Sequence, residues 1–361
     1  MSKIKLFIYL LILLILTTGC GKKPLDNDSS ITLDIRKTAK VFNGKRILHA
    51  PDIMGIIGAD DRDGLIGFLT FSGEKVLYLI NPNNRSAKQL SVAENGKNIS
   101  SAVMEKNHLI WVEKDLVSWN ILHKDLSSGE VTILDKGTFF TEGGMDYPYL
   151  SLSENDLVYN ISEQGENGEL ISKIIYINLN NRSKDVIGYL KGKNTYLGAP
   201  SIYNKNVVWH RGEWGNELNA EIYLYNLERK DRKTITSEFN AAITPVIWEN
   251  YIAYNTYNTE NPEVKNIEIR DIQTNKTHKL TNNETDSRLE SWGPTIDDGK
   301  VAWKTNHPTT NITVYLTDKS SFEIIDSPTY HTSIYGSWIV WLSVNTQKQG
   351  FYLCRADGVK Q

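Results

Sequence analysis

The chain is poor in cysteine, with only Cys20 and Cys354 among its 361 residues. A framework of several disulfide bonds, on which many small exported domains depend, is therefore excluded. Cys354 ends the apolar segment Phe351–Cys354, and this setting predicts a buried and unreactive thiol. The stability of the fold must come from its hydrophobic core.

The sequence also lacks an excess of basic charge and any long amphipathic helix. Its net charge is −3, which argues against nucleic acid as a partner. Beyond residue 19, no stretch of about twelve residues keeps a helical apolar period without Gly, Pro or Asn interrupting it. These absences predict an all-β protein.

Only one long apolar run is present, at Leu6–Leu16, and it follows Lys3 and Lys5. The run is shorter than the roughly 20 residues of a membrane span and has the length of a signal peptide. It ends in Thr17-Thr18-Gly19-Cys20, which resembles the lipobox of bacterial lipoproteins, although Thr17 stands where that family usually has Leu. The resemblance implies that residues 1–19 are removed and that Cys20 is acylated, for example with palmitate. Residues 20–30 would then be the lipidated cysteine and a flexible tether.

A short strand that ends in an aromatic residue recurs roughly every 45 residues, which is the size of a four-stranded propeller blade. The copies are Leu65–Phe68, Leu109–Trp111, Leu157–Tyr159, Val207–Trp209, Ile252–Tyr254, Val301–Trp303 and Ile339–Trp341. Several are preceded by a proline, which a strand tolerates at its start: Pro148, Pro200, Pro245 and Pro294.

Seven copies predict a seven-bladed β-propeller over residues 31–361, with six or eight blades as alternatives. The last copy has room for only three strands before the chain ends. We therefore expect Ile31–Ile35 to pair into the last blade and close the ring, which would remove exposed sheet edges.

The repeat resembles the TolB-type, WD40-like propellers of bacterial cell envelopes. That family's Ser-Pro-Asp-Gly turn is reduced here to segments such as Ile296–Lys300, Ser153–Asp156 and Tyr203–Asn206. The resemblance covers nearly all of residues 31–361. It implies an extracytoplasmic protein whose loops meet a partner.

Candidate ligand-binding residues lie in the loops after the second strands and between blades, because propellers bind ligands mainly at one mouth of the channel. Aromatic faces beside polar groups suit sugars or peptides. The candidates are His210, Arg211, Glu213, Trp214, Tyr147, Tyr196, Trp292 and His331. Packing between blades is the alternative role for each of them.

The sequence gives little support to catalysis and predicts neither a metal nor a cofactor. No Gly-x-Ser-x-Gly elbow is present, and the seven histidines form no His-x-x-x-His pair. Oligogalacturonate lyases are similar propellers that hold a divalent metal with channel-facing histidines. His210, His307 and His331 could converge in that way, so the metal-dependent lyase stays open as an alternative.

These observations favour a non-catalytic envelope lipoprotein, anchored through Cys20 to the outer face of a bacterial membrane. Its propeller would act as a monomer and bind a protein, peptide or glycan. A propeller enzyme (a metal-dependent polysaccharide lyase or a glycosidase) and a TolB-like assembly factor are the alternatives.

Overall fold

The computed structural model describes a chain made almost entirely of strands. The described residues are 30–32, 41–42, 45–46, 48–50, 55–59, 64–71, 74–94, 96–139, 147–235, 241–257, 261, 264–281, 290–307, 309–316, 321–325, 329–343 and 350–355. Cys20 and the predicted signal peptide lie outside them. Within these ranges, no helix is long and apolar enough to cross a membrane.

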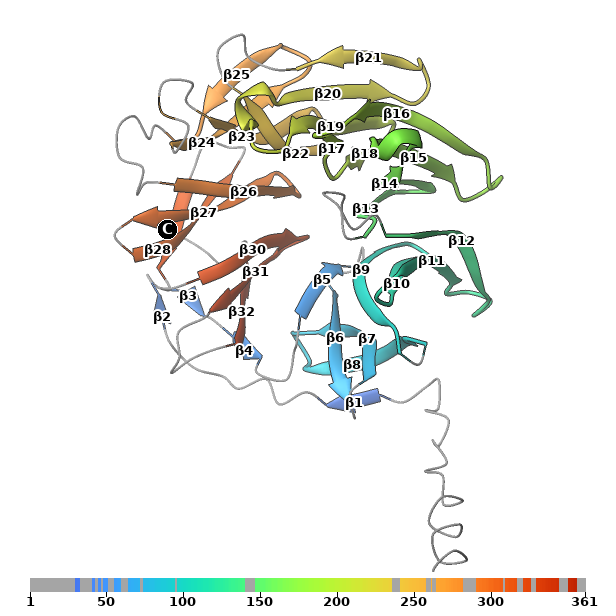
Figure 1. The fold of residues 1–361 in the computed structure, drawn as a ribbon. Coiled ribbons are helices and arrows are strands. Elements are labelled where there is room, and N and C mark those ends of the chain that lie inside the picture. The colour runs from blue at the N-terminus through green and yellow to red at the C-terminus, as the bar shows by residue number, and fades with distance from the viewer. Residues whose placement is uncertain are drawn as a thin grey trace, which may run out of the picture.

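The strands form seven antiparallel sheets of four or five strands, arranged around a common centre, and one two-stranded ribbon (Figure 1). The first sheet contains β5 (Gly55–Ala59), β6 (Leu65–Phe71), β7 (Glu74–Asn81) and β8 (Ser86–Val92), with β1 (Ser30–Thr32) added at its outer edge. The second contains β9 (Asn98–Glu105), β10 (His108–Lys114), β11 (Ser118–Asp125) and β12 (Val131–Thr138). The third contains β13 (Leu150–Ser153), β14 (Asp156–Gln164), β15 (Leu170–Asn178) and β16 (Lys184–Gly192).

The remaining sheets repeat this order. The fourth contains β17 (Thr195–Leu197), β18 (Ser201–Tyr203), β19 (Asn206–Glu213), β20 (Glu221–Asn226) and β21 (Asp231–Thr234). The fifth contains β22 (Ala242–Trp248), β23 (Tyr251–Tyr257), β24 (Lys265–Asp271) and β25 (Lys276–Lys279). The sixth contains β26 (Glu290–Asp297), β27 (Lys300–His307), β28 (Thr309–Leu316) and β29 (Ser321–Ile325), and the seventh contains β30 (Thr329–Tyr335), β31 (Trp338–Ser343), β32 (Gly350–Arg355) and β4 (Leu48–Ala50). The ribbon is β2 (Val41–Phe42) with β3 (Lys45–Arg46), and short 3₁₀ turns lie at Glu166–Gly168 and Glu217–Asn219.

The core lies between neighbouring sheets, and repeated aromatic residues of the second strands pack in it. Each of the seven predicted strands is the second strand of its sheet, as the repeat predicts. Trp111 packs with residues of the first sheet, Trp209 with the third and Trp303 with the fifth, and all three are almost fully buried. Leu65 and Val76 of the first sheet share a core with Trp338 and Leu353 of the seventh. Cys354 is buried, as predicted.

Pro148 and Pro200 lie before the starts of β13 and β18, as expected, whereas Pro245 and Pro294 are placed differently. Pro245 and Pro294 lie inside β22 and β26, where the pairing register shifts, and Pro200 separates β17 from β18. A bulge or a break is where a strand accepts a residue that cannot donate a backbone hydrogen bond. The prolines therefore mark irregular points of the inner strands.

The predicted pairing of Ile31–Ile35 with the last sheet is wrong for the residues that the structure describes. Ile31 pairs with Ala87 of β8, in the first sheet. The strand beside β32 is β4, in which Leu48, His49 and Ala50 pair with Leu353, Tyr352 and Phe351. Both segments are short and extended, and their local sequence does not encode which distant edge each one meets.

Candidate functional site

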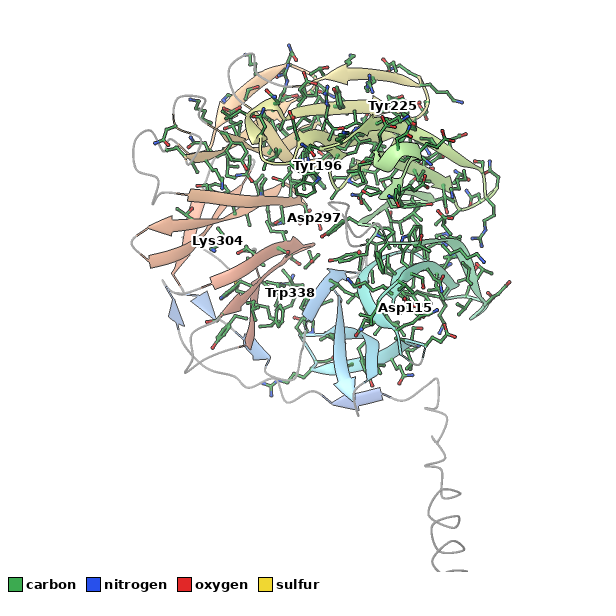
Figure 2. All side chains as sticks on the ribbon, in the orientation of Figure 1. Asp115, Tyr196, Tyr225, Asp297, Lys304 and Trp338 are labelled. Carbon is green, nitrogen blue, oxygen red and sulfur yellow. The ribbon has the colours of Figure 1, made fainter. Side chains whose placement is uncertain are left out.

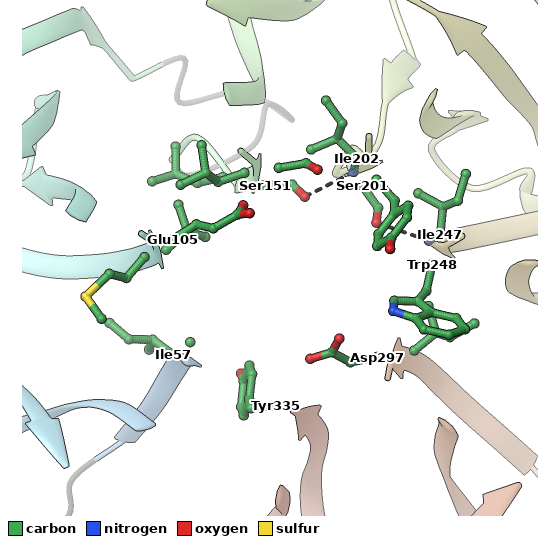
Figure 3. A pocket seen from close by; sticks show the side chains of 17 residues that line it. Ile57, Glu105, Ser151, Ser201, Ile202, Ile247, Trp248, Asp297 and Tyr335 are labelled. Carbon is green, nitrogen blue, oxygen red and sulfur yellow. Dashed lines mark hydrogen bonds between the residues drawn. The ribbon is translucent and has the colours of Figure 1, made fainter. Parts of the chain in front are cut away.

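A cavity of about 530 Å³ lies where the innermost strands of the sheets end (Figure 3). Every one of the seven sheets contributes at least one residue to its wall. Leu150–Ser153 and Ser201–Tyr203 come from the third and fourth sheets, and Trp248, Asp297 and Tyr335 come from the last three. The wall is thus built from residues far apart in the sequence.

Side-chain oxygens on the inner strands bind the backbone of the next sheet and hold the wall together. The Oγ atoms of Ser151 and Ser201 accept hydrogen bonds from the backbone N of Ile202 and Ile247, each at 3.1 Å. Thr295 Oγ1 accepts one from Ile334 N, also at 3.1 Å. The same offset of about 40 to 50 residues recurs in each bond, as expected of repeated units.

A second level of such bonds lies at the ends of the inner strands. Glu105 Oε2 accepts a hydrogen bond from Glu154 N at 2.5 Å, Ser153 Oγ accepts one from Asn204 N at 2.9 Å, and Asp297 Oδ2 accepts one from Gly336 N at 2.7 Å. Each donor is the first residue of a two-residue turn and has a positive φ. Glu105 and Asp297 are thereby fixed in orientation at the cavity.

The charge on the cavity wall is negative. Among its described lining residues only Glu105 and Asp297 are charged, and their carboxylates enter the cavity from opposite sides (Figure 3). Burial raises the pKa of Asp297. The pKa of Tyr203 is raised by burial first and then by the carboxylates of Glu249, Asp297 and Glu105. A positively charged group in the cavity would be attracted to these partly buried carboxylates.

The predicted cluster around His210 lies at the opposite face of the molecule. The cavity face is the face on which the inner strands end, at turns such as Ser153–Asp156. The loop face is the face on which the second strands end, as β19 does at Glu213. Asn206 at the start of β19 pairs with Tyr203, whereas Glu213 at its end pairs with Thr195. Seven residues of strand separate these levels by about 23 Å.

Three of the predicted residues do meet on the loop face. The rings of Tyr196 and Trp214 stack with their centroids 4.3 Å apart, and Tyr196 meets His210 edge to face at 5.6 Å. Glu213 accepts a hydrogen bond from Asn219 Nδ2 at 3.2 Å. Arg211 is exposed and lies opposite Glu221 in the register of β19 with β20.

Tyr147 contacts other residues than this group. Tyr147 packs beneath the ammonium group of Lys114, 4.3 Å from its ring centre, and beside Tyr149. Trp292 lies on β26 and His331 on β30, and their side chains are outside the described part of the structure. The ligand-binding role of these residues stays a prediction.

His210 is buried, with only 5% of its surface exposed, and its Nδ1 accepts a hydrogen bond from Thr244 N at 3.3 Å. Asn160 and Asn255 occupy the same place, directly after the aromatic residue of their own second strands. Asn255 Oδ1 also accepts a hydrogen bond from the next sheet, from Gly293 N at 3.0 Å. The position thus joins one sheet to the next.

This burial gives a testable dependence of stability on pH. It lowers the pKa of His210 to about 4, against about 6.5 in an unfolded chain. Between these values the unfolded chain binds more protons, so the free energy of unfolding falls as the pH is lowered from about 6.5 to about 4. The variant His210→Asn, which takes the residue found at positions 160 and 255, should weaken this dependence in urea titrations. An identical pH dependence in both proteins would contradict the assignment.

A metal bound by histidines, as in the lyase alternative, does not fit the residues that can be assessed. His210 is enclosed by Tyr196, Gly198 and Thr244. In the described ranges, no three His, Cys, Asp or Glu side chains are grouped closely enough to hold a metal ion. The side chains of His307 and His331 lie outside those ranges.

Sequence reasoning missed the cavity residues Glu105 and Asp297. A signal was available, because each is the last strand residue before a two-residue turn, as are Ser153 and Tyr203. Aligning the turns would have shown that this position recurs in the second to seventh repeats, where it lines the cavity. The acidic character of the cavity followed only from bringing residues of several sheets together.

The repeated sheets around a central cavity define a β-propeller. No protein-family model and no curated protein matches the chain. Among solved structures, an oligogalacturonate lyase in complex with manganese aligns over 91% of this chain and 98% of its own, with a TM-score of 0.65 and 17% identity. The β-propeller domain of the Trilobed protease from Pyrococcus furiosus aligns over 79% and 90%, with a TM-score of 0.57 and 10% identity.

TolB from Acinetobacter baumannii is also among the similar structures. It aligns over 73% of this chain and 63% of its own, at 18% identity and a TM-score of 0.46, which is too low to add to the argument. At these identities the likeness shows a shared fold.

Proposed function

We propose that the protein is a lipid-anchored, seven-bladed propeller of the bacterial cell envelope that binds a peptide segment of a partner protein in its axial cavity. Seven blades are supported by the seven sheets and by the cavity wall, to which all of them contribute. A closed ring is supported by the pairing of β4 with β32 and by the core that the first and seventh sheets share. Both contacts lie within one chain, so the ring can close in a monomer.

Anchoring is proposed from the sequence, on the short apolar run and the Gly19-Cys20 pair. In cell fractionation, we expect Cys20→Ser to move the protein from the membrane to the soluble fraction, because the thiol would carry the lipid. Cys354→Ser is the control, since that thiol is buried and should not affect the anchor. Membrane retention of Cys20→Ser would contradict the lipoprotein assignment.

The acidic and aromatic cavity is the observation that carries the binding function. Its charged lining residues in the described chain are both carboxylates, and Trp248, Tyr203 and Tyr335 supply aromatic faces. Carboxylates pair with ammonium or guanidinium groups, and aromatic faces attract the same cations. Among proteins, peptides and glycans, this composition favours a peptide that presents a Lys or Arg side chain.

Titration with short Arg-containing peptides, followed by calorimetry, tests the proposal. We expect Asp297→Asn and Glu105→Gln each to weaken binding about tenfold, or about 1.4 kcal/mol, because a charge is lost while an oxygen remains to accept the wall's hydrogen bond. Glu154→Gln is a matched control, since Glu154 is an acid of the same face that pairs with Lys106 and does not line the cavity. Equal binding by all three variants, or no preference for Arg over Glu peptides, would contradict the cavity as the binding site.

A propeller enzyme is the second candidate, favoured by the alignment with oligogalacturonate lyase over 91% of the chain. Incubation with oligogalacturonate and Mn²⁺, with detection of an unsaturated product, tests it directly. Turnover by the wild-type protein would replace the non-catalytic proposal. An envelope assembly role like that of TolB would show as binding to a folded partner protein in place of a free peptide.

A further inference from the structure

Large apolar side chains are exposed on the loop face. Leu116 is 94% exposed and Val117 68%, in the turn between β10 and β11. Tyr149, just before β13, and Trp214, just after β19, are also exposed on this face. The other large apolar side chains exposed in the described chain lie on outer strands: Val131, Ile133, Val186 and Tyr189.

Leu116 and Val117 are held outward by a well-ordered turn. Asp115 Oδ1 accepts hydrogen bonds from the backbone N of Val117 and Ser118, both at 2.7 Å, and Asp115 Oδ2 accepts one from Ser118 Oγ at 2.7 Å. Asp115 N also donates to Ser118 O at 3.0 Å. Figure 2 labels Asp115 in the second sheet, well away from Asp297 at the centre. The turn thus presents two aliphatic side chains to the exterior in a fixed geometry.

The cavity face has the opposite character. Its two-residue turns carry only polar residues or glycine: Lys106-Asn107, Glu154-Asn155, Asn204-Lys205, Glu249-Asn250, Asp298-Gly299 and Gly336-Ser337. None of the exposed large apolar side chains belongs to these turns. The two-residue turns of the cavity face are therefore polar, whereas the turn of Leu116 and Val117 on the loop face is apolar.

The direction of β1 relates these faces to the anchor at Cys20. Thr32 pairs with Ser86 and Ser30 with Lys88, while β8 continues from there to Val92 at the loop face. Ser30 is therefore the end of β1 that is nearer to the loop face, which is about four residues, or about 13 Å, away. Residues 21–29 can span at most about 30 Å when extended. A lipid on Cys20 can thus reach the loop face. The tether also keeps the propeller within about 30 Å of the membrane.

We propose that the loop face of the second to fourth sheets lies on the lipid surface, with Leu116 and Val117 inserted among the acyl chains and Trp214 and Tyr149 at the headgroup level. This rests on the proposed anchor and adds an orientation to it. Aliphatic tips bind lipid in proportion to their buried apolar area, and Trp and Tyr favour the interface because their rings are both apolar and polar. The cavity face is then directed away from the membrane, where partner proteins can reach it.

The test uses the full lipidated chain in vesicles of phosphatidylglycerol and phosphatidylethanolamine. A single cysteine is placed at position 116 or 107 in a Cys354→Ala background and labelled with the fluorophore NBD. Leu116→Cys and Asn107→Cys are matched, because they flank opposite ends of the same strand, β10, and both sites are exposed. We expect a blue-shifted emission at position 116, quenched at least twofold by acyl chains that carry nitroxide groups, and no quenching at position 107.

The outcomes separate the proposal from the anchor on which it rests. If the chain sediments with vesicles but the probe at 116 stays in water, the orientation is wrong and the anchor stands. If the emission at 116 is blue-shifted without quenching by the lipid nitroxides, protein and not lipid covers the patch, and the proposal is overturned. If the wild-type chain does not sediment with vesicles, the anchor and the orientation fail together.

Discussion

A chain that begins at residue 51, and so lacks β1 to β4, is expected to be less stable than the full protein by about 3 kcal/mol, mainly through the loss of β4. The loss corresponds to roughly three backbone hydrogen bonds at the register pairs of Leu48, His49 and Ala50 with β32. Its melting temperature should fall by about 5–10 °C in calorimetry. The freed edge of β32 should also promote association between chains, because an unpaired strand is a template for another.

The control is a chain that begins at residue 41, which loses β1 and keeps β4. β1 only adds a fifth strand to the first sheet, so we expect this chain to melt close to the full protein. If the two truncated chains melt together, β4 does not close the ring.

Replacing Gly198 by alanine is expected to destabilise the fold by about 3 kcal/mol, at the upper end of the cost of overpacking a core. An added Cβ would lie 1.9 Å from His210 Cε1 and 2.3 Å from its Nδ1. The imidazole has little room to move, since it accepts a hydrogen bond from Thr244 N and meets the ring of Tyr196. Urea titration of the purified variant measures the loss.

Two variants make this prediction specific. The double variant Gly198→Ala with His210→Ala removes the clashing ring, so it should be more stable than the sum of the two single losses predicts. Gly215→Ala places a methyl group where nothing lies within 4 Å, and its cost should be confined to the strain of the positive φ, about 1 kcal/mol. Additive losses in the double variant would show that the ring is not the cause.

Local sequence patterns predict only part of the candidate site. The loop beyond Trp209 attracts notice because charged and aromatic residues follow one another there, and Tyr196, His210 and Trp214 do meet. His210, however, directly follows the repeated aromatic residue, as Asn160 and Asn255 do, and only the structure shows that this position bonds to the next sheet. Glu105 and Asp297 lie almost two hundred residues apart and have no unusual neighbours in the sequence.

The sequence by itself determined the β class, the repeated hairpins and the buried aromatic residue in the second strands of the second to seventh sheets. Those features depend on period-2 apolar patterns and on turns between adjacent segments, whose causes are local. Only the tertiary structure decided that β4 and not β1 pairs with β32, that the inner strands bring two carboxylates to one cavity, and that the apolar tips lie on the face that is nearer to the first residue of β1. Each of these depends on pairing or convergence between distant segments, and short strands carry too little pattern of their own to select such partners.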